Sequence, residues 1–242
     1  NGQLGDGTTT NRLTPTTVSG LTGATAITAG IYHTCASKQN GTAACWGDNS
    51  NGQLGDGTTT TRLTPTSVSG LTGATAIAAG YAHTCARNPS GLVACWGRNS
   101  DGQLGDGTTT NRLTATTVPG LTGVAVVTAG TFHTCAVKQD GIIACWGDNN
   151  QGELGDGTTT DRPTPNRVIG LTAITSITAG GTHTCALKQD GTADCWGNNG
   201  NGRLGDGTTT TRTTPTPVIG LTAATAITAG YSHTCALKQD GT

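Results

Sequence analysis

The sequence is short of the residues from which helical proteins are built. It contains no methionine, one phenylalanine and three tyrosines, and charged residues make up only 11% of its 242 residues. A helical bundle uses Leu, Met, Glu and Lys in quantity, so this composition argues against one. Glycine, at 39 residues, and threonine are abundant instead. Small and β-branched residues with frequent glycine suit short strands joined by tight turns.

Clustered positive charge and long apolar runs are missing as well. The formal net charge is −1 and no run of Lys or Arg occurs. This argues against electrostatic binding of nucleic acid. No stretch approaches the roughly 18 apolar residues of a membrane helix. We therefore expect neither a nucleic-acid partner nor a membrane span.

What the sequence does contain is one 50-residue unit, repeated without gaps. We expect a single repeat domain over residues 1–242, with repeats 1–50, 51–100, 101–150, 151–200 and a shorter 201–242. The motif LGDGTTT begins at Leu4, Leu54, Leu104, Leu154 and Leu204. A period in this range is typical of solenoids and propellers.

Each repeat predicts four short strands, at residues 14–18, 24–29, 33–38 and 42–46 in the first copy. The first is expected at an outer edge, because Pro15 cannot donate a ladder hydrogen bond. The last two form a hairpin around Gly41. Four-stranded units of this length are propeller blades, and a single blade needs neighbours to cover its faces. The prediction is an all-β propeller with four complete blades and a fifth that lacks its last strand.

Cysteines recur ten residues apart on the two strands of that hairpin. In a hairpin that pairs Lys38 with Thr42, Cys35 lies opposite Cys45 at a non-hydrogen-bonded site, where side chains approach most closely. Four cross-strand disulfides are therefore expected, and Cys235 stays unpaired because its partner position, 245, lies beyond the sequence. The pairs are Cys35–Cys45, Cys85–Cys95, Cys135–Cys145 and Cys185–Cys195.

Disulfides imply an oxidising compartment, hence a secreted or cell-surface protein. Metal binding or free thiols are the alternatives. His33 precedes Cys35 by two residues, so both would face the same side of a strand. The short Cys-x2–4-Cys knuckles of zinc sites are absent.

The order of these motifs resembles the RCC1 repeat: GQLGDG, a Pro-x-x-Val strand, a small-residue strand ending in AG, then HTCA, a DG turn and CWG. The resemblance covers the whole chain and implies a β-propeller, usually of seven blades. With five repeats, this chain is expected to be part of a larger ring or array, or to receive its missing strand from another chain. It is similar in style to secreted bacterial RCC1-like propellers, one of which inhibits β-lactamases through its loop face.

Several polar and aromatic residues recur once per repeat. A ring of histidines could bind metal or sense pH, but a hydrogen bond that fixes the blade is the plainer interpretation. Asp6 with Arg12 fits a turn-capping ion pair better than a calcium or phosphate loop, which needs more carboxylates or a lysine. We assign these residues and Trp46 structural roles. The histidines are His33, His83, His133, His183 and His233.

The two residues between AG and HTC differ from copy to copy, and we call them the slot residues. All three tyrosines and the only phenylalanine lie there: Tyr32, Tyr81, Phe132 and Tyr231. Aromatic side chains are favoured at protein interfaces, so these four are candidate partner-binding residues, although filling between blades would explain them as well. A second variable set follows CWG, and we expect it to be solvent-exposed and able to tune specificity from blade to blade: Asp48, Arg98, Asp148 and Asn198, then Gln53, Gln103, Glu153 and Arg203.

The sequence is compatible with two functions. The first is an extracellular binding module that holds a protein or glycan on its loop face, without catalysis, cofactor or metal. The second is a structural surface or filament protein that self-associates through the incomplete blade. No Ser lies in a nucleophile elbow and the acidic residues are scattered singly, so we expect no enzyme.

Overall fold

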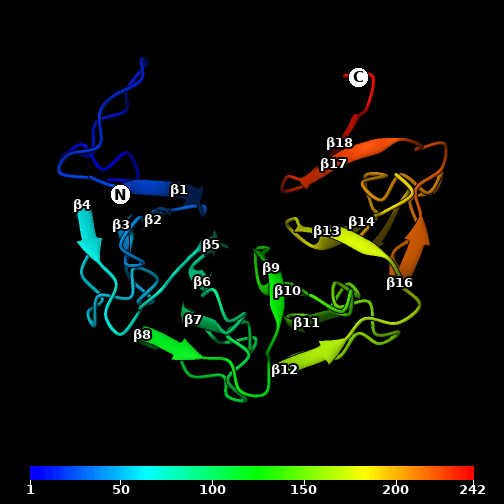
Figure 1. Cartoon of the computed structure of the whole chain (residues 1–242), viewed down its shortest axis with the longest axis horizontal. Coiled ribbons are helices and arrows are strands. Elements are labelled where there is room, and N and C mark those ends of the chain that lie inside the picture. The colour runs from blue at the N-terminus through cyan, green and yellow to red at the C-terminus, as the bar shows by residue number, and fades with distance from the viewer.

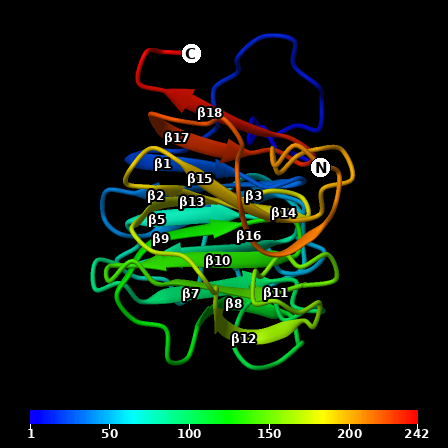
Figure 2. The ribbon, with the colours of Figure 1, turned by 90° about the vertical axis from the view of Figure 1, so that its right-hand side faces the viewer.

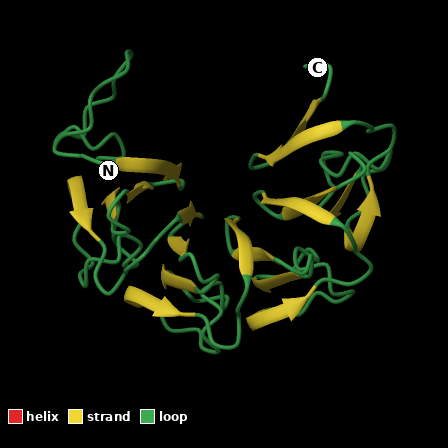
Figure 3. Ribbon diagram, viewed as in Figure 1, coloured by secondary structure: helices red, strands yellow, loops and turns green.

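The computed structural model describes residues 1–242 as strands, turns and loops without any helix (Figure 3). It thus contains no helix that could cross a membrane. The strands form four four-stranded antiparallel sheets and one two-stranded sheet. In chain order they are β1 (Ala24–Ala29), β2 (His33–Lys38), β3 (Ala43–Gly47), β4 (Arg62–Ser67), β5 (Ala76–Ala79), β6 (His83–Arg87), β7 (Val93–Gly97), β8 (Arg112–Thr117), β9 (Val124–Ala129), β10 (His133–Lys138), β11 (Ile143–Gly147), β12 (Arg162–Arg167), β13 (Ile174–Ala179), β14 (His183–Lys188), β15 (Ala193–Gly197), β16 (Arg212–Pro217), β17 (Ala224–Ala229) and β18 (Thr234–Lys238).

The sheets are arranged as blades around a common axis, with the inner strands β1, β5, β9, β13 and β17 nearest to it (Figure 1). The ring is open between β1 and the pair β17–β18 (Figure 1). From the side, the blades follow one another as layers (Figure 2). The prediction of an all-β propeller with four complete blades and a partial fifth is confirmed.

Each complete blade takes its outer strand from the following repeat. The sheet order β1-β2-β3-β4 joins three strands of the first repeat to one of the second, with Cys45 opposite Thr66 and Gly47 opposite Arg62. The same exchange links the later repeats. The outer position of the proline-containing strand is as expected, since the free edge of a sheet tolerates a residue that cannot donate.

The prediction of a strand at residues 14–18 is wrong for the first repeat, where these residues form no strand. The equivalent segments pair with the Cys-Trp-Gly strand of the repeat before them, and residues 1–13 do not contain such a strand. For the same reason the fifth blade consists of β17 and β18 alone. Its third strand and its outer strand have no counterpart within the sequence.

The hydrophobic core lies between blades rather than within one. Cys85 and Cys95 of the second blade pack with Val127 and Trp146 of the third, together with the loop residue Leu104. Equivalent clusters lie at the other interfaces. All four tryptophans are at most 1% exposed, and Trp96, Trp146 and Trp196 are each buried against the blade that precedes their own.

The four expected disulfides are present, each joining cysteines that lie directly opposite one another in the hairpin with Cα atoms 4.1 Å apart. Their cysteines are fully buried. Closing a loop of about ten residues stabilises the fold by roughly 2–3 kcal/mol per bridge in the chain-entropy model. Cys235 is free and exposed on β18.

Candidate functional site

One end of the propeller carries both sets of variable positions. The loop after each Cys-Trp-Gly strand starts beside the slot residues of its own blade, because Gly47 pairs with His33. The Asp48 N–H donates to the carbonyl oxygen of Tyr32 (2.9 Å), and the Asp148 N–H donates to that of Phe132 (3.0 Å). We call this end, made of residues 30–32 and 48–61 and their counterparts in the other blades, the slot face.

Three of the four predicted binding aromatics form a continuous arc on the slot face. The Tyr32 and Tyr81 ring centroids are 5.6 Å apart in an edge-to-face arrangement, and those of Tyr81 and Phe132 are 5.3 Å apart. The Arg98 guanidinium lies 4.5 Å from the Phe132 ring centroid. Tyr231, in the fifth blade, is separate from the arc and 65% exposed. The structure thus brings together aromatics that lie about 50 residues apart in the chain.

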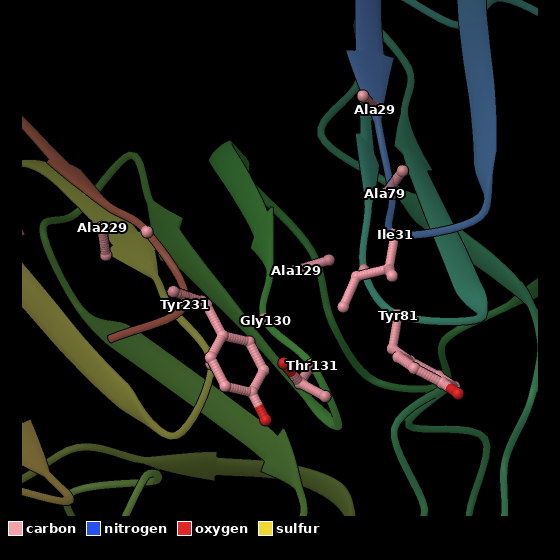
Figure 4. A pocket seen from close by; sticks show the side chains of 15 residues that line it. Ala29, Ile31, Ala79, Tyr81, Ala129, Gly130, Thr131, Ala229 and Tyr231 are labelled. Atoms are coloured by element: carbon pink, nitrogen blue, oxygen red, sulfur yellow. The ribbon is translucent and has the colours of Figure 1, made fainter. Parts of the chain in front are cut away.

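A funnel opens on the blade axis beside this arc. Its cavity of about 220 Å³ is lined by the Ala-Gly-x segments of all five blades. Figure 4 looks into it and shows Tyr231 and Tyr81 on either side of Thr131. The glycines are needed there because a Cβ at Gly80 would overlap the carbonyl oxygen of Gly130.

Four of the five repeat histidines connect neighbouring blades, the exception being His233 in the fifth blade, and none of the five lines the funnel. His33 Nε2 lies 2.9 Å from Thr84 Oγ1, and Thr84 Oγ1 donates to the carbonyl oxygen of Gln53 (2.9 Å). Since the single hydroxyl proton is committed to Gln53, His33 must donate, which fixes its Nε2–H tautomer. The same bond recurs as His83–Thr134, His133–Thr184 and His183–Thr234.

These histidines stay neutral. Burial lowers the pKa of His83 and His133 to about 3 and that of His33 and His183 to about 4. No group of three or more His, Cys, Asp or Glu side chains is placed to hold a metal ion. An interblade hydrogen bond, rather than a ligand or a pH switch in the physiological range, is the role that this geometry supports.

Asp56 shows the role of the recurring Asp–Arg pair. Its Oδ2 pairs with Arg62 (2.7 Å), and its Oδ1 accepts from the Thr58 N–H and the Asn49 side-chain amide. Burial opposes ionisation of Asp56, but hydrogen bonds from Thr58, Arg62 and Asn49 outweigh it and hold its pKa below the usual range. The pair organises the loop, as do Asp6 and Arg12 in the first repeat (2.7 Å).

Sequence reasoning missed two residues in these networks. Asn49 is fully buried, and its side-chain amide nitrogen donates its two hydrogens among four loop oxygens of Asp56, Thr58 and Thr60 that lie within hydrogen-bond distance. Its signal was the asparagine that follows every Cys-Trp-Gly-x. Thr84, also fully buried, accepts from the histidine of the preceding blade. Its signal was the invariant threonine after each histidine.

Comparison with protein families gives a match in all five copies. The family model for the regulator of chromosome condensation (RCC1) repeat matches residues 1–37, 40–87, 90–137, 140–187 and 190–237. The chain belongs to the RCC1 repeat family. A second RCC1 repeat model matches four segments between residues 24 and 203. No curated protein matches the RCC1 repeats of this chain significantly.

Several solved structures are similar in fold to this RCC1-repeat chain. Human WBSCR16 superposes with a TM-score of 0.80 at 22% identity, over 88% of this chain and 57% of its own. Prp20p from Saccharomyces cerevisiae, studied for its binding to Gsp1p and histones, gives 0.77 at 22% identity, over 90% and 57%. The ectodomain of the Arabidopsis thaliana receptor kinase ACR4 gives 0.54 at 18% identity, over 92% and 63%. This chain therefore spans less than two thirds of each of these proteins.

Among the RCC1 repeats of this chain, Glu153 breaks the pattern most sharply. Gln53 occupies the same place in the first blade, where its amide donates to Asp48 (2.6 Å) and its oxygen accepts from the Asn51 N–H. Glu153 is fully buried and accepts from the Gln151 N–H (2.8 Å), but its Oε1 has no partner. Burial and the nearby Asp148 carboxylate raise the pKa of Glu153 to about 8.

Proposed function

We propose that this RCC1-repeat chain is an extracellular binding module that holds a protein or glycan partner on its slot face. The observation that carries the proposal is the aromatic arc of Tyr32, Tyr81 and Phe132 beside an open axial funnel. Aromatic anchors next to a cavity are typical of the centre of an interface. A binding rather than a catalytic role is part of the proposal, and the use of the repeat histidines as interblade donors supports it.

An extracellular setting is supported by the cysteines. All eight that can pair within the chain do so. Disulfides of this kind persist in oxidising compartments and are rare in the reducing cytosol.

The proposal can be tested with a variant that replaces Tyr32, Tyr81, Phe132 and Tyr231 by alanine. Wild-type and variant protein are used to capture partners from the secreted and surface fraction of the source cells. A control variant carries Leu92→Ala and Ile219→Ala, which remove exposed apolar side chains outside the slot face. We expect the control to retain the partners of the wild type and the slot variant to lose them. Retention by a correctly folded slot variant would show that the slot face is not the binding surface.

A structural role with blade completion between chains is the second candidate, favoured by the fifth blade. A cavity of about 260 Å³ lies there against Leu204, Val218 and Ile227. At the preceding interface Trp196 packs against the equivalent residues. The free edge of β18 and the exposed Cys235 would accept a Cys-Trp-Gly strand from another chain.

This candidate predicts oligomers that depend on Cys235. Light scattering of the oxidised protein over a range of concentrations should show them, and Cys235→Ser or reduction should weaken them. A monomer under all of these conditions would exclude blade completion between chains.

A further inference from the structure

The carboxylates without an ion-pair partner are concentrated on the slot face. Nine of the 14 acidic residues form ion pairs with Lys or Arg. Four of the remaining five lie in the loops of the slot face, and the fifth, Asp190, lies at a hairpin tip on the opposite end. The four are Asp48, Asp148, Glu153 and Asp161.

Glu153 is fully buried and keeps its proton at neutral pH, so the negative charge of this group is carried by Asp48, Asp148 and Asp161, in the loops next to the two ends of the aromatic arc. Asp48 is hydrogen-bonded through its N–H to Tyr32, and Asp148 is bonded in the same way to Phe132. Asp161 accepts from the Asn149 N–H (2.8 Å) next to Asp148. Asp101 and Asp161 lie close enough to Asp148 to raise its pKa further, in addition to the effect of burial. The carboxylates of Asp48, Asp148 and Asp161 therefore have no ion-pair partner within the chain.

The chain also shows how a cation is held on this surface. Arg98 places its guanidinium over the Phe132 ring (4.5 Å) and pairs with Asp101 (3.4 Å). The position of Arg98 in the second blade is occupied by Asp48 in the first and Asp148 in the third. Arg98 is thus flanked in the neighbouring blades by two carboxylates, Asp48 and Asp148, that have no ion-pair partner.

We propose that the slot face binds a basic segment of a partner protein, whose Arg or Lys side chains lie over the Tyr32–Tyr81–Phe132 arc and pair with Asp48, Asp148 and Asp161. This proposal rests on the binding role of the slot face argued above. A cation over an aromatic ring with a carboxylate beside it gains both cation–π and Coulombic energy. Phosphate-bearing partners would be repelled by the same charges, and a neutral glycan would leave them uncompensated.

The test uses a charge-matched pair of variants of the full oxidised chain. The slot-face variant carries Asp48→Asn, Asp148→Asn and Asp161→Asn, each a residue that another repeat has at that position (Asn198 and Asn111). The control carries Asp140→Asn, Asp190→Asn and Asp240→Asn, which place the Asn40 of the first repeat on three further hairpin tips. Both remove three negative charges, so only the location differs.

Binding of fluorescein-labelled nona-arginine is followed by anisotropy at low and at physiological salt. We expect the wild type and the control to bind alike, and the slot-face variant to bind about ten-fold more weakly, with most of that difference screened at the higher salt. Nona-glutamate should not bind. Equal weakening in both variants would overturn the proposal, because it would reduce the effect to net charge. So would binding of nona-glutamate or of a neutral oligosaccharide in place of nona-arginine.

The outcome separates this inference from the proposed function. If nona-arginine does not bind but partner capture still depends on the four aromatic slot residues, the slot face binds a partner that is not basic. If capture is also independent of those residues, the proposed function itself fails.

Discussion

Replacing Glu153 with glutamine is expected to stabilise the protein at neutral pH and to leave its stability unchanged at pH 4. In the folded protein, burial and Asp148 hold the pKa of Glu153 at about 8, against 4.5 for an unperturbed glutamate. Between these values the unfolded chain has lost the proton and the folded chain keeps it. The contribution of Glu153 to wild-type stability therefore falls as the pH rises, by up to about 1.4 kcal/mol per pH unit.

The size of the effect follows from that difference. At pH 7 the linkage alone amounts to about 3 kcal/mol, and structural relaxation around the carboxyl should reduce it to about 2 kcal/mol. Glutamine has no proton to lose, and its amide can donate to Asp148 as Gln53 donates to Asp48. For a chain of this size the gain corresponds to a rise in melting temperature of about 4–8 °C.

Urea unfolding of oxidised protein at several pH values between 4 and 8 measures the effect. Gln103→Glu is the reciprocal control, because Gln103 is fully buried at the equivalent position of the second blade. It should lose stability at pH 7 and match the wild type at pH 4. The reasoning is refuted if Glu153→Gln gives no gain at pH 7, or the same gain at both pH values.

The remaining predictions concern the interfaces between blades. Thr84→Val removes the acceptor of His33 and the donor to Gln53, and should lower the unfolding free energy by about 1–3 kcal/mol in denaturant titration; an unchanged value would contradict the interblade bond. Because burial lowers the pKa of the four interblade histidines below the ordinary value of 6.5, the unfolded state takes up protons first. Stability should thus fall as the pH drops from 6.5 towards 4, by up to about 1.4 kcal/mol per unit for each histidine, and a flat profile would exclude this linkage. The Cys85–Cys95 bond is fully buried, so a mild reductant should open it only under unfolding conditions, and thiol titration of native protein should detect Cys235 alone.

Much of the fold could be predicted because the same strand and turn pattern occurs in five copies of the repeat. The period gives the blade, and the position of Gly41 gives the hairpin register that places Cys35 opposite Cys45. The exchange of the outer strand could not be found in this way. Residues 14–18 closely resemble 64–68, yet only the latter segment has a partner strand, and strand pairing depends on what lies nearby in space rather than on local sequence.

The candidate site was predictable in composition but not in arrangement. Variation between copies singled out Tyr32, Tyr81 and Phe132, and only the blade geometry shows that their rings form one arc. The histidine partner is 51 residues away in the chain, beyond any local pattern. The carboxyl of Glu153 looked like a solvent-exposed variant of Gln53, whereas the structure buries it fully.

The exchange of outer strands has a consequence for how such a gene can change. Every blade is assembled across a repeat junction, so each 50-residue window contains the parts of one blade wherever the window begins. Unequal recombination between near-identical copies would add or remove whole blades, and every remaining interface would keep its tryptophan, its histidine bond and its bridged hairpin. Blade number can therefore evolve in single genetic steps while the slot residues diversify separately.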